Sequence, residues 1–256
     1  MSDATVRFDV EGGLARITLD RPESMNGITN QMMRELVGVL QAVAADRSIR
    51  VLVLTGEGRA FCPGADLKHY RDGGSEDRLS SADFVMTTLL HEMPAVTVAA
   101  INGACAGAGL GWALACDLRL MSDAAKLNTA FLDVAVAGDM AIPWSLSRLI
   151  GASRARALSF MPRKLDAAEA LDLGIVASVF PAASFRADVE DVVATLLKKS
   201  PTALLGLKGN YVAAERMSLA DFVEYEAERH LRISASSDTA EAFRAFLEKR
   251  EPNFGN

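Results

Sequence analysis

The chain has 256 residues, of which 50% are hydrophobic and 23% are charged, and its formal net charge is -6. This balance is typical of a folded globular protein and argues against disorder. A net negative charge with scattered Lys and Arg excludes the basic face that nucleic-acid binding requires. Three cysteines without a CxxC pair predict buried free thiols rather than disulfides. The first residues show no signal-peptide pattern, so we expect a cytoplasmic protein.

The first half of the chain alternates predicted strands and helices. Apolar residues alternate on both sides of Gly12-Gly13, which predicts a hairpin over 5–20. Thr29 or Asn30 is a predicted N-cap for a helix whose apolar positions recur at helical spacing. The apolar run at 50–56 predicts a strand covered on both faces. A loop is predicted at 72–78, followed by a helix around 81–93.

The pattern continues with a strand at 95–101, a buried helix at 109–116 and a strand at 117–122. Strand, glycine turn, helix and strand in succession predict crossover connections in an α/β core. Asp166 and Glu169 form a capping box for a helix that ends at Gly174, and 175–180 is a last short strand. From about residue 184 only helices are predicted, with capping boxes at Ser218/Asp221 and Asp238/Glu241. We therefore expect an α/β core over 1–190 and a helical region over 191–256, with Pro201 near the join.

A membrane span is the alternative for residues 93–116, which are 24 residues without a charge. Gly103, Gly107 and Gly111 lie there at the spacing of transmembrane helix contacts. However, 95–101 is β-branched, and the turn signal Asn102-Gly103 interrupts the stretch in its middle. These signals favour a strand followed by a packed helix, without membrane insertion.

The glycines in "NGACAGAGLGWALACD" (102–117) match no common ligand-binding fingerprint. They do not form the GxGxxG pattern, and the chain contains no GxxxxGK[ST] loop and no GxSxG elbow. The three histidines are far apart in sequence, so no metal site is expected. Two interpretations stay open: the glycines allow close helix–strand packing, or they allow a ligand to approach the main chain.

Two segments together resemble the crotonase (enoyl-CoA hydratase/isomerase) superfamily. They are "RVLVLTGEGRAFCPGADLKHY" at 50–70 and "AVTVAAINGACAGAGLGWALACDLRLMSDAAKL" at 95–127. The resemblance continues in "ITLDRPESMNGIT", in "RKLDAAEALDLGIVASVFP" and in the terminal "AEAFRAFLEKREPNF". It therefore covers nearly the whole chain in the same order.

The resemblance implies a core that is a spiral of ββα turns and a C-terminal helical unit that supports a homotrimer or a hexamer. It also implies an acyl-coenzyme A thioester as the substrate, with no separate cofactor. By position, the thioester oxygen would lie between the main-chain N–H groups of Ala65 and Ala108. Glycine neighbours would leave room for the ligand, and the helix dipole at 108 would favour an enolate. One such donor is typically worth about 3–4 kcal/mol of barrier.

The resemblance also bears on the reaction. The two glutamates of family hydratases are replaced by Gly111 and Phe131, neither of which can transfer a proton. Asp139 stands where related isomerases and dehalogenases carry an aspartate. Double-bond isomerisation with Asp139 as the single acid/base is the simpler interpretation, because no His matches the base of a dehalogenase. A turn or N-cap role for Asp139 is the alternative, Asp133 is a weaker candidate acid, and Asp117 is expected to open a strand.

The remaining expectations concern substrate contacts and other functions. Lys or Arg side chains would approach the coenzyme A phosphates, with Arg59, Lys68 and Lys249 as candidates, and Met86 could line the acyl pocket. A hydratase with a modified mechanism, a non-catalytic acyl-CoA-binding protein and a membrane protein are the alternatives. The candidate substrate-binding residues are Met25, Ala60, Phe61, Asp66, Leu67, Lys68, Gly107, Phe131 and Trp144.

Overall fold

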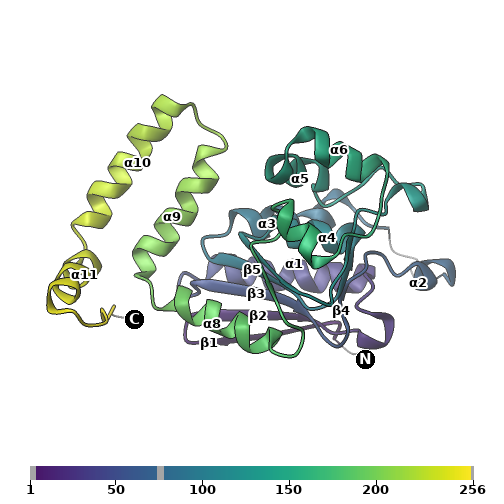
Figure 1. Ribbon diagram of the computed structural model, residues 1–256, viewed down its shortest axis with the longest axis horizontal. Coiled ribbons are helices and arrows are strands. Elements are labelled where there is room, and N and C mark those ends of the chain that lie inside the picture. Colours follow the sequence, from purple (N-terminus) through teal and green to yellow (C-terminus); the bar gives the residue numbers. More distant parts are fainter. Residues whose placement is uncertain (1–3, 74–77, 255–256) are drawn as a thin grey trace.

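The computed structural model describes residues 4–73 and 78–254, and its core is built on two sheets (Figure 1). The large sheet has the strand order β1-β2-β3-β5-β7-β9, and the small sheet has the order β4-β6-β8. The strands of the large sheet are β1 (Val6–Glu11), β2 (Leu14–Leu19), β3 (Val51–Gly56), β5 (Val96–Ile101), β7 (Leu118–Ser122) and β9 (Ser178–Phe180). Those of the small sheet are β4 (Ala60–Cys62), β6 (Ala104–Ala106) and β8 (Leu127–Asn128).

Helices follow the strands and cover the sheets. The helices of the core are α1 (Asn30–Ala45), α2 (Leu67–Arg71), α3 (Met86–Glu92), α4 (Gly107–Ala115), α5 (Ile142–Ile150), α6 (Ala152–Phe160), α7 (Ala167–Asp172) and α8 (Phe185–Leu197). Three further helices end the chain: α9 (Pro201–Ala214), α10 (Leu219–Ser234) and α11 (Ser237–Glu248). Short 3-10 turns lie at Pro22–Ser24, Ser81–Phe84 and Leu132–Val134.

The chain winds as a spiral in which each turn gives one strand to each sheet. The pairs β3–β4, β5–β6 and β7–β8 each place their first strand in the large sheet and their second in the small sheet. Each pair is followed by helices, and every pairing except the β1–β2 hairpin is parallel. The predicted ββα spiral is thus confirmed.

Strand β3 of the large sheet is buried on both faces, as the apolar run at 50–56 predicted. Leu52 and Leu54 of β3 belong to the main core cluster with α1, α3 and α4, whereas Val51 and Val53 face a second cluster with α8. Because side chains alternate across a strand, a strand between two helical layers needs apolar residues at every position.

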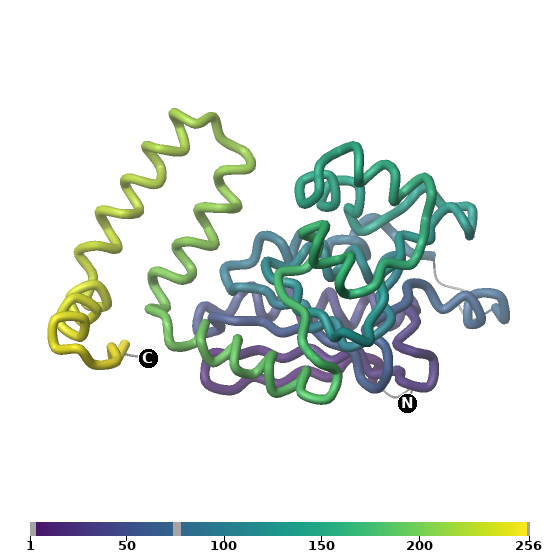
Figure 2. Tube along the Cα trace, in the orientation of Figure 1, coloured from purple at the N-terminus to yellow at the C-terminus, as the bar shows by residue number. Residues whose placement is uncertain are grey.

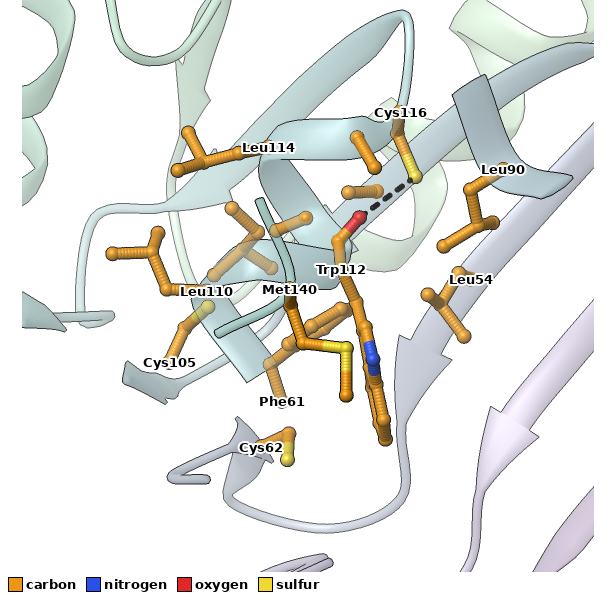
Figure 3. Close-up of a cluster of buried hydrophobic side chains, with 14 of the residues drawn as sticks. Leu54, Phe61, Cys62, Leu90, Cys105, Leu110, Trp112, Leu114, Cys116 and Met140 are labelled. Atoms are coloured by element: carbon orange, nitrogen blue, oxygen red, sulfur yellow. Dashed lines mark hydrogen bonds between the residues drawn. The ribbon is translucent and has the colours of Figure 1, made fainter. Parts of the chain in front are cut away.

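Helix α4 is the central element of the main core. Eight of its nine residues are buried, and Trp112 is fully buried. Figure 3 shows Trp112 among the side chains of that cluster, with its carbonyl oxygen accepting a hydrogen bond from Cys116. The uncharged stretch is divided among β5, β6 and α4, and the described residues include no helix long and apolar enough to cross a membrane.

The short strands of the small sheet were not predicted. Asn102 links the two sheets because its side-chain amide donates to the carbonyl groups of Gly58 and Ala60. Gly103 follows, and a Cβ there would lie only 2.8 Å from the carbonyl carbon of Arg59. The expected Asn-Gly turn therefore serves to bring β6 beside β4.

The predicted caps of the last two helices have different outcomes. Ser218 caps α10 by accepting from the N–H of Asp221, as predicted. The capping box at Asp238/Glu241 is wrong, because Ser236 is the N-cap of α11. Asp238 instead accepts a hydrogen bond from Ser200, and Glu241 pairs with Arg250. Of the loop expected at 72–78, residues 74–77 lie outside the described residues.

The last three helices form an arm that extends from the core (Figures 1 and 2). Helix α8 spans the boundary expected at residue 190, and its buried residues pack on the sheet. Beyond it, α9 has one buried residue, Lys208, α10 has none, and α11 has Ala245. The Lys208 ammonium pairs with Asp117, which also accepts two hydrogen bonds from Thr97 of β5. This pair fastens the arm to the core.

We expect Lys208→Ala to lower the free energy of unfolding by about 3 kcal/mol, because it leaves the Asp117 carboxylate without its cation. Urea denaturation measures this change. Lys199→Ala, at an exposed position, is the control and should change stability by no more than about 0.5 kcal/mol. Equal effects of the two substitutions would contradict the role given to the pair.

Candidate active site

The end of β4 and the beginning of α4 approach each other at main-chain distance. Gly64 has a φ of +97°, and a Cβ there would lie 3.2 Å from the carbonyl oxygen of Ala106 and 3.6 Å from the nitrogen of Ala108. A Cβ at Gly109 would lie 2.6 Å from the Cβ of Cys62. Glycine is therefore required on both sides of this contact.

The glycines of α4 differ in how closely they are packed. Gly109 and Gly111 are buried against Cys62 and Met140, which is close packing. Gly107 has a φ of +51°, and its nearest neighbours would be 3.7–3.9 Å from a Cβ, among them Gly64 and the ring of Phe131. Of these three glycines, only Gly107 would meet its neighbours at ordinary van der Waals distances if it carried a Cβ.

The amide of Ala65 lies in the turn after β4, and that of Ala108 lies in the first turn of α4. Around Ala65, Ile28 donates to the carbonyl of Gly64, and Asp66 donates to the carbonyl of Ile28. Neither of these two hydrogen bonds involves the N–H of Ala65. The N–H of Ala108 lies in the first turn of a helix, where it has no intrahelical partner. Across residues 4–73 and 78–254, neither N–H donates a hydrogen bond.

An ion pair holds the Ala65 turn in place. Asp66 caps α2 by accepting from the N–H of His69, and it pairs with Arg21 at 3.0 Å. Arg21 also donates to the carbonyl of Gly27. Burial alone would raise the pKa of Asp66, but the bonds from His69 and Arg21 outweigh it and lower that pKa. The carboxylate of Asp66 is thus engaged by Arg21 and by the N–H of His69.

Asp139 lies in the segment before α5, with its side chain half-buried. Its main-chain oxygen accepts from the N–H of Ile142, while Ala141, not Asp139, is the N-cap of α5. Its Oδ1 is buried and has no hydrogen-bond partner among the described residues. Burial raises the pKa of Asp139. The N-cap part of the alternative is therefore wrong, whereas the main chain of Asp139 does belong to a turn.

The segment that carries Asp139 packs near the first turn of α4. The ring of Phe131 lies next to both Gly138 and Gly107, and Gly107 in turn lies next to Gly64, which directly precedes Ala65. Burial raises the pKa of the Cys62 thiol to about 12, and the negative charge of Asp139 adds to that rise. The segment with this half-buried carboxyl and the turn that holds the Ala65 amide therefore both adjoin the beginning of α4.

The other candidate acids have different surroundings. Asp133 is exposed in the 3-10 turn at Leu132–Val134. Asp117 precedes β7, as expected, and is paired with Lys208. Asp133 thus lacks the partial burial of Asp139, and Asp117 is partly buried but has a cation as its partner.

Of the two positions that correspond to the hydratase glutamates, position 111 has no space for a side chain and position 131 holds an aromatic ring. A Cβ at Gly111 would lie 2.8 Å from the carbonyl oxygen of Met140 and closer still to its Cβ. The ring of Phe131 lies between Gly107 and Gly138, at 3.9 Å and 3.7 Å from where their Cβ atoms would be. Position 111 has no room for any side chain without a shift of the main chain.

The other predicted contacts are distributed more widely. Ala60, Phe61 and Met86 are fully buried in the core, whereas Leu67 and Lys68 are exposed on α2, and Met25 is half-buried. Trp144 lines a separate pocket between α3 and α5, where Arg148 lies over its ring and His91 meets the ring edge-on. Arg59 is exposed beside β4, but Lys249 lies on the arm, at the opposite end of the molecule from α2 (Figure 1).

Sequence reasoning did not select Gly64, Thr87 or Met140. A glycine after Pro63 was a visible signal for Gly64, since the turn needs a positive φ there. Thr87 and Met140 gave no signal, because their roles depend on contacts across about 30 to 50 residues.

Comparison with known proteins places the chain in a family. The family model described as enoyl-CoA hydratase/isomerase matches residues 9–256. A protein of Rhodobacter capsulatus named a probable enoyl-CoA hydratase is 34% identical over 259 residues, 99% of each chain. The 1,2-epoxyphenylacetyl-CoA isomerase of Escherichia coli is 33% identical over 252 residues, 96% of each chain. The crystal structure of an enoyl-CoA hydratase from Bacillus anthracis superimposes with a TM-score of 0.90, at 28% identity over 98% of each chain. The chain belongs to the enoyl-CoA hydratase/isomerase family of the crotonase superfamily.

The Arg21–Asp66 pair generates a pH-dependent prediction. The folded-state pKa of Asp66 lies below its ordinary value of 3.8, so its contribution to stability is present above that pH and is lost as the pH falls through the lowered pKa. Asp66→Asn should destabilise the protein at pH 7 by about 1–2 kcal/mol, and the deficit should shrink below about pH 4. Urea denaturation across this range measures it, with Asp9→Asn on the exposed face of β1 as the control. A deficit that stays constant with pH would argue against the charge of Asp66 as its cause.

Proposed function

We propose that this family member is an acyl-CoA isomerase that moves a carbon–carbon double bond with Asp139 as its single acid/base. The observation that carries the proposal is one half-buried carboxyl, with a free Oδ1 and a raised pKa, in a segment that packs through Phe131 against the first residue of α4. A raised pKa lies closer to neutral pH, so the carboxyl can both accept a proton and return it.

The proposed oxyanion site consists of the N–H groups of Ala65 and Ala108. The free state of both donors and the missing side chain at Gly64 support it. Removing a proton from C2 of a 3-enoyl thioester places negative charge on the thioester oxygen. Two main-chain donors and the amino end of α4 would stabilise that charge in the transition state more than in the substrate.

The proton balance of this reaction needs only one carboxyl group. Asp139 in its ionised form accepts the C2 proton, the electrons of the C–H bond delocalise into a dienolate, and Asp139 then returns the proton to C4. The double bond moves from C3–C4 to C2–C3, and no water is consumed. A single carboxylate is sufficient because it ends the cycle in the state in which it began.

Two other functions are weighed against this one. Hydration requires a second group to activate water, and neither Gly111 nor Phe131 can do so, although relatives are named enoyl-CoA hydratases. A hydratase would therefore need a modified mechanism. The same replacements would suit a non-catalytic acyl-CoA-binding protein, but such a protein has no need of a buried carboxyl with a raised pKa.

Coenzyme A binding and assembly are parts of the same proposal. Arg59 and Lys68, near β4 and α2, are proposed to approach the phosphates, with main chain of the loop 59–67 on the adenine. Lys249 could serve only the site of a neighbouring copy, because it follows α11, at the opposite end of the molecule from α2. A homotrimer or hexamer built through residues 191–256 would cover the apolar side chains that the arm exposes. These side chains include Leu219, Leu231, Phe243, Phe246 and Leu247. A cytoplasmic location stays a prediction.

Asp139→Asn should lower kcat for 3-enoyl-CoA isomerisation by about 10²- to 10⁴-fold, since the amide cannot accept a proton. Calorimetry with a saturated acyl-CoA should show unchanged affinity, and Asp133→Asn is the matched control. Hydration of 2-enoyl-CoA without isomerisation would favour the modified hydratase. Tight binding without turnover over a range of chain lengths would favour the binding protein.

The raised pKa of Asp139 has opposite consequences for activity and for stability. A base must be ionised, so kcat/KM should rise with pH through an apparent pKa above 3.8, while the neighbouring Cys62 thiol stays protonated. Because folding disfavours the ionised carboxyl, Asp139→Asn should raise the free energy of unfolding at pH 7. This gain should shrink once the pH falls below the raised pKa and vanish below the ordinary value of 3.8. Urea denaturation at several pH values measures it. A loss of stability at pH 7 would indicate a structural aspartate.

Gly64→Ala should weaken acyl-CoA binding at least tenfold, because the methyl group would lie 3.6 Å from the nitrogen of Ala108, in the space proposed for the thioester oxygen. Calorimetry with a saturated acyl-CoA measures this. Gly174→Ala is the matched control: its φ of +76° gives comparable backbone strain, but a Cβ there meets nothing within 4 Å. If the two variants bind equally well, the proposed oxyanion site is wrong.

A further inference from the structure

The segment that carries Asp139 has an unusual main-chain conformation. Gly138, Met140 and Ala141 all have positive φ values, of +101°, +46° and +57°. Two of these residues carry a Cβ, for which the left-handed region is sparsely populated. Such a conformation persists only when surrounding contacts hold it.

Helix α4 supplies the main contact. Gly111 faces Met140 so closely that a Cβ at position 111 would lie 2.8 Å from the Met140 carbonyl oxygen and nearer still to the Met140 Cβ. The nearest atoms thus belong to the main chain and to Cβ, which a rotamer change cannot move away. The turn can adopt its position only because residue 111 has no side chain.

The side chain of Met140 provides a second attachment. It is buried in the main core cluster, which Figure 3 shows together with Trp112 and Cys62. Its sulfur accepts a hydrogen bond at 3.4 Å from the hydroxyl of Thr87, a buried residue of α3. Met140 is therefore held from α4 at its main chain and from α3 at its tip, directly after Asp139.

We propose that Gly111 and Met140 are positioning residues that hold the Asp139 carboxyl beside α4, and that a side chain at position 111 and the 138–141 turn exclude each other. The functional part of the inference rests on the proposed acid/base role of Asp139. Its structural part, the link between position 111 and the environment of the Asp139 carboxyl, can be tested without any assay of activity.

The exclusion has a chemical consequence. By its resemblance to family hydratases, position 111 is where a glutamate would stand. A glutamate there would push Met140 away and move Asp139 with it. This main chain can therefore hold a carboxyl on α4 or a carboxyl on the 138–141 turn at the same site, but not both.

The test follows the carboxyl of Asp139 by carbon-13 NMR in protein labelled at aspartate, with Asp139→Asn to assign its signal. Gly111→Ala adds one methyl group at the contact, and Met140→Gly removes the attached side chain without adding an atom. Gly38→Ala is the matched control, because Gly38 is also a helical glycine but a Cβ there meets nothing within 4 Å. The kinetic constants kcat and KM for 3-enoyl-CoA are measured for the same four proteins and the wild type.

We expect the pKa of Asp139 to fall towards its ordinary value in Gly111→Ala and in Met140→Gly, as the carboxyl moves into water. We also expect kcat to fall at least tenfold with KM within about twofold, since small displacements of a catalytic group can cost about a hundredfold in rate. If the wild type does not isomerise 3-enoyl-CoA, the proposed function fails, but the titration still decides on the positioning.

A wild-type titration of Asp139 in either soluble variant, together with an unchanged kcat, would overturn the inference. If Gly111→Ala does not fold, Met140→Gly decides alone, because it creates space and adds no clash. A rise in KM with an unchanged kcat and an unchanged titration would also overturn it, since it would assign Gly111 to substrate binding rather than to the placement of Asp139.

Discussion

The close approach between the β4 turn and the first turn of α4 is the contact on which the rest of the site depends. Gly64 on one side and Gly109 on the other leave no Cβ between the two main chains, so amides from separate turns of the spiral come together. The spiral itself makes this possible, because each turn sends a short strand into the small sheet and starts its helix at the same edge. Main-chain N–H groups are kept whatever the side chain of their residue, so an arrangement built on them does not depend on side-chain identity.

The surroundings of Asp139 set it apart from the paired aspartates of the core. The carboxyl is carried by a turn that is strained in its main chain, and the partly buried position disfavours its charge. Both features cost stability and are typical of functional groups rather than of structural ones. By contrast, Asp66 and Asp117 are satisfied by Arg21 and Lys208. Aspartates of one core thus differ in chemistry because their partners differ.

Much of the fold could be predicted because hydrophobic periodicity is a local property. The β1–β2 hairpin, the Thr29 cap of α1 and the doubly covered strand β3 all follow from residues within a few positions of one another. The strands of the small sheet have only two or three residues and show no period. The Asp238 cap failed because Ser236, two residues earlier, competes for the same helix end. Asp139 was selected through a resemblance, whereas the contact of Gly111 with Met140 exists only once α4 and the 138–141 turn have packed together.

The arm of α9, α10 and α11 has a consequence for how this protein should be handled in solution. Its apolar residues are exposed along α10 and α11, and Lys208 and Ala245 are the buried residues of its three helices. Helices of this length gain little stability in water without a packed apolar face. Any contact between copies that covers them would link the melting of the arm to the amount of protein present, by mass action. Dilution would then loosen the arm long before it disturbs the spiral.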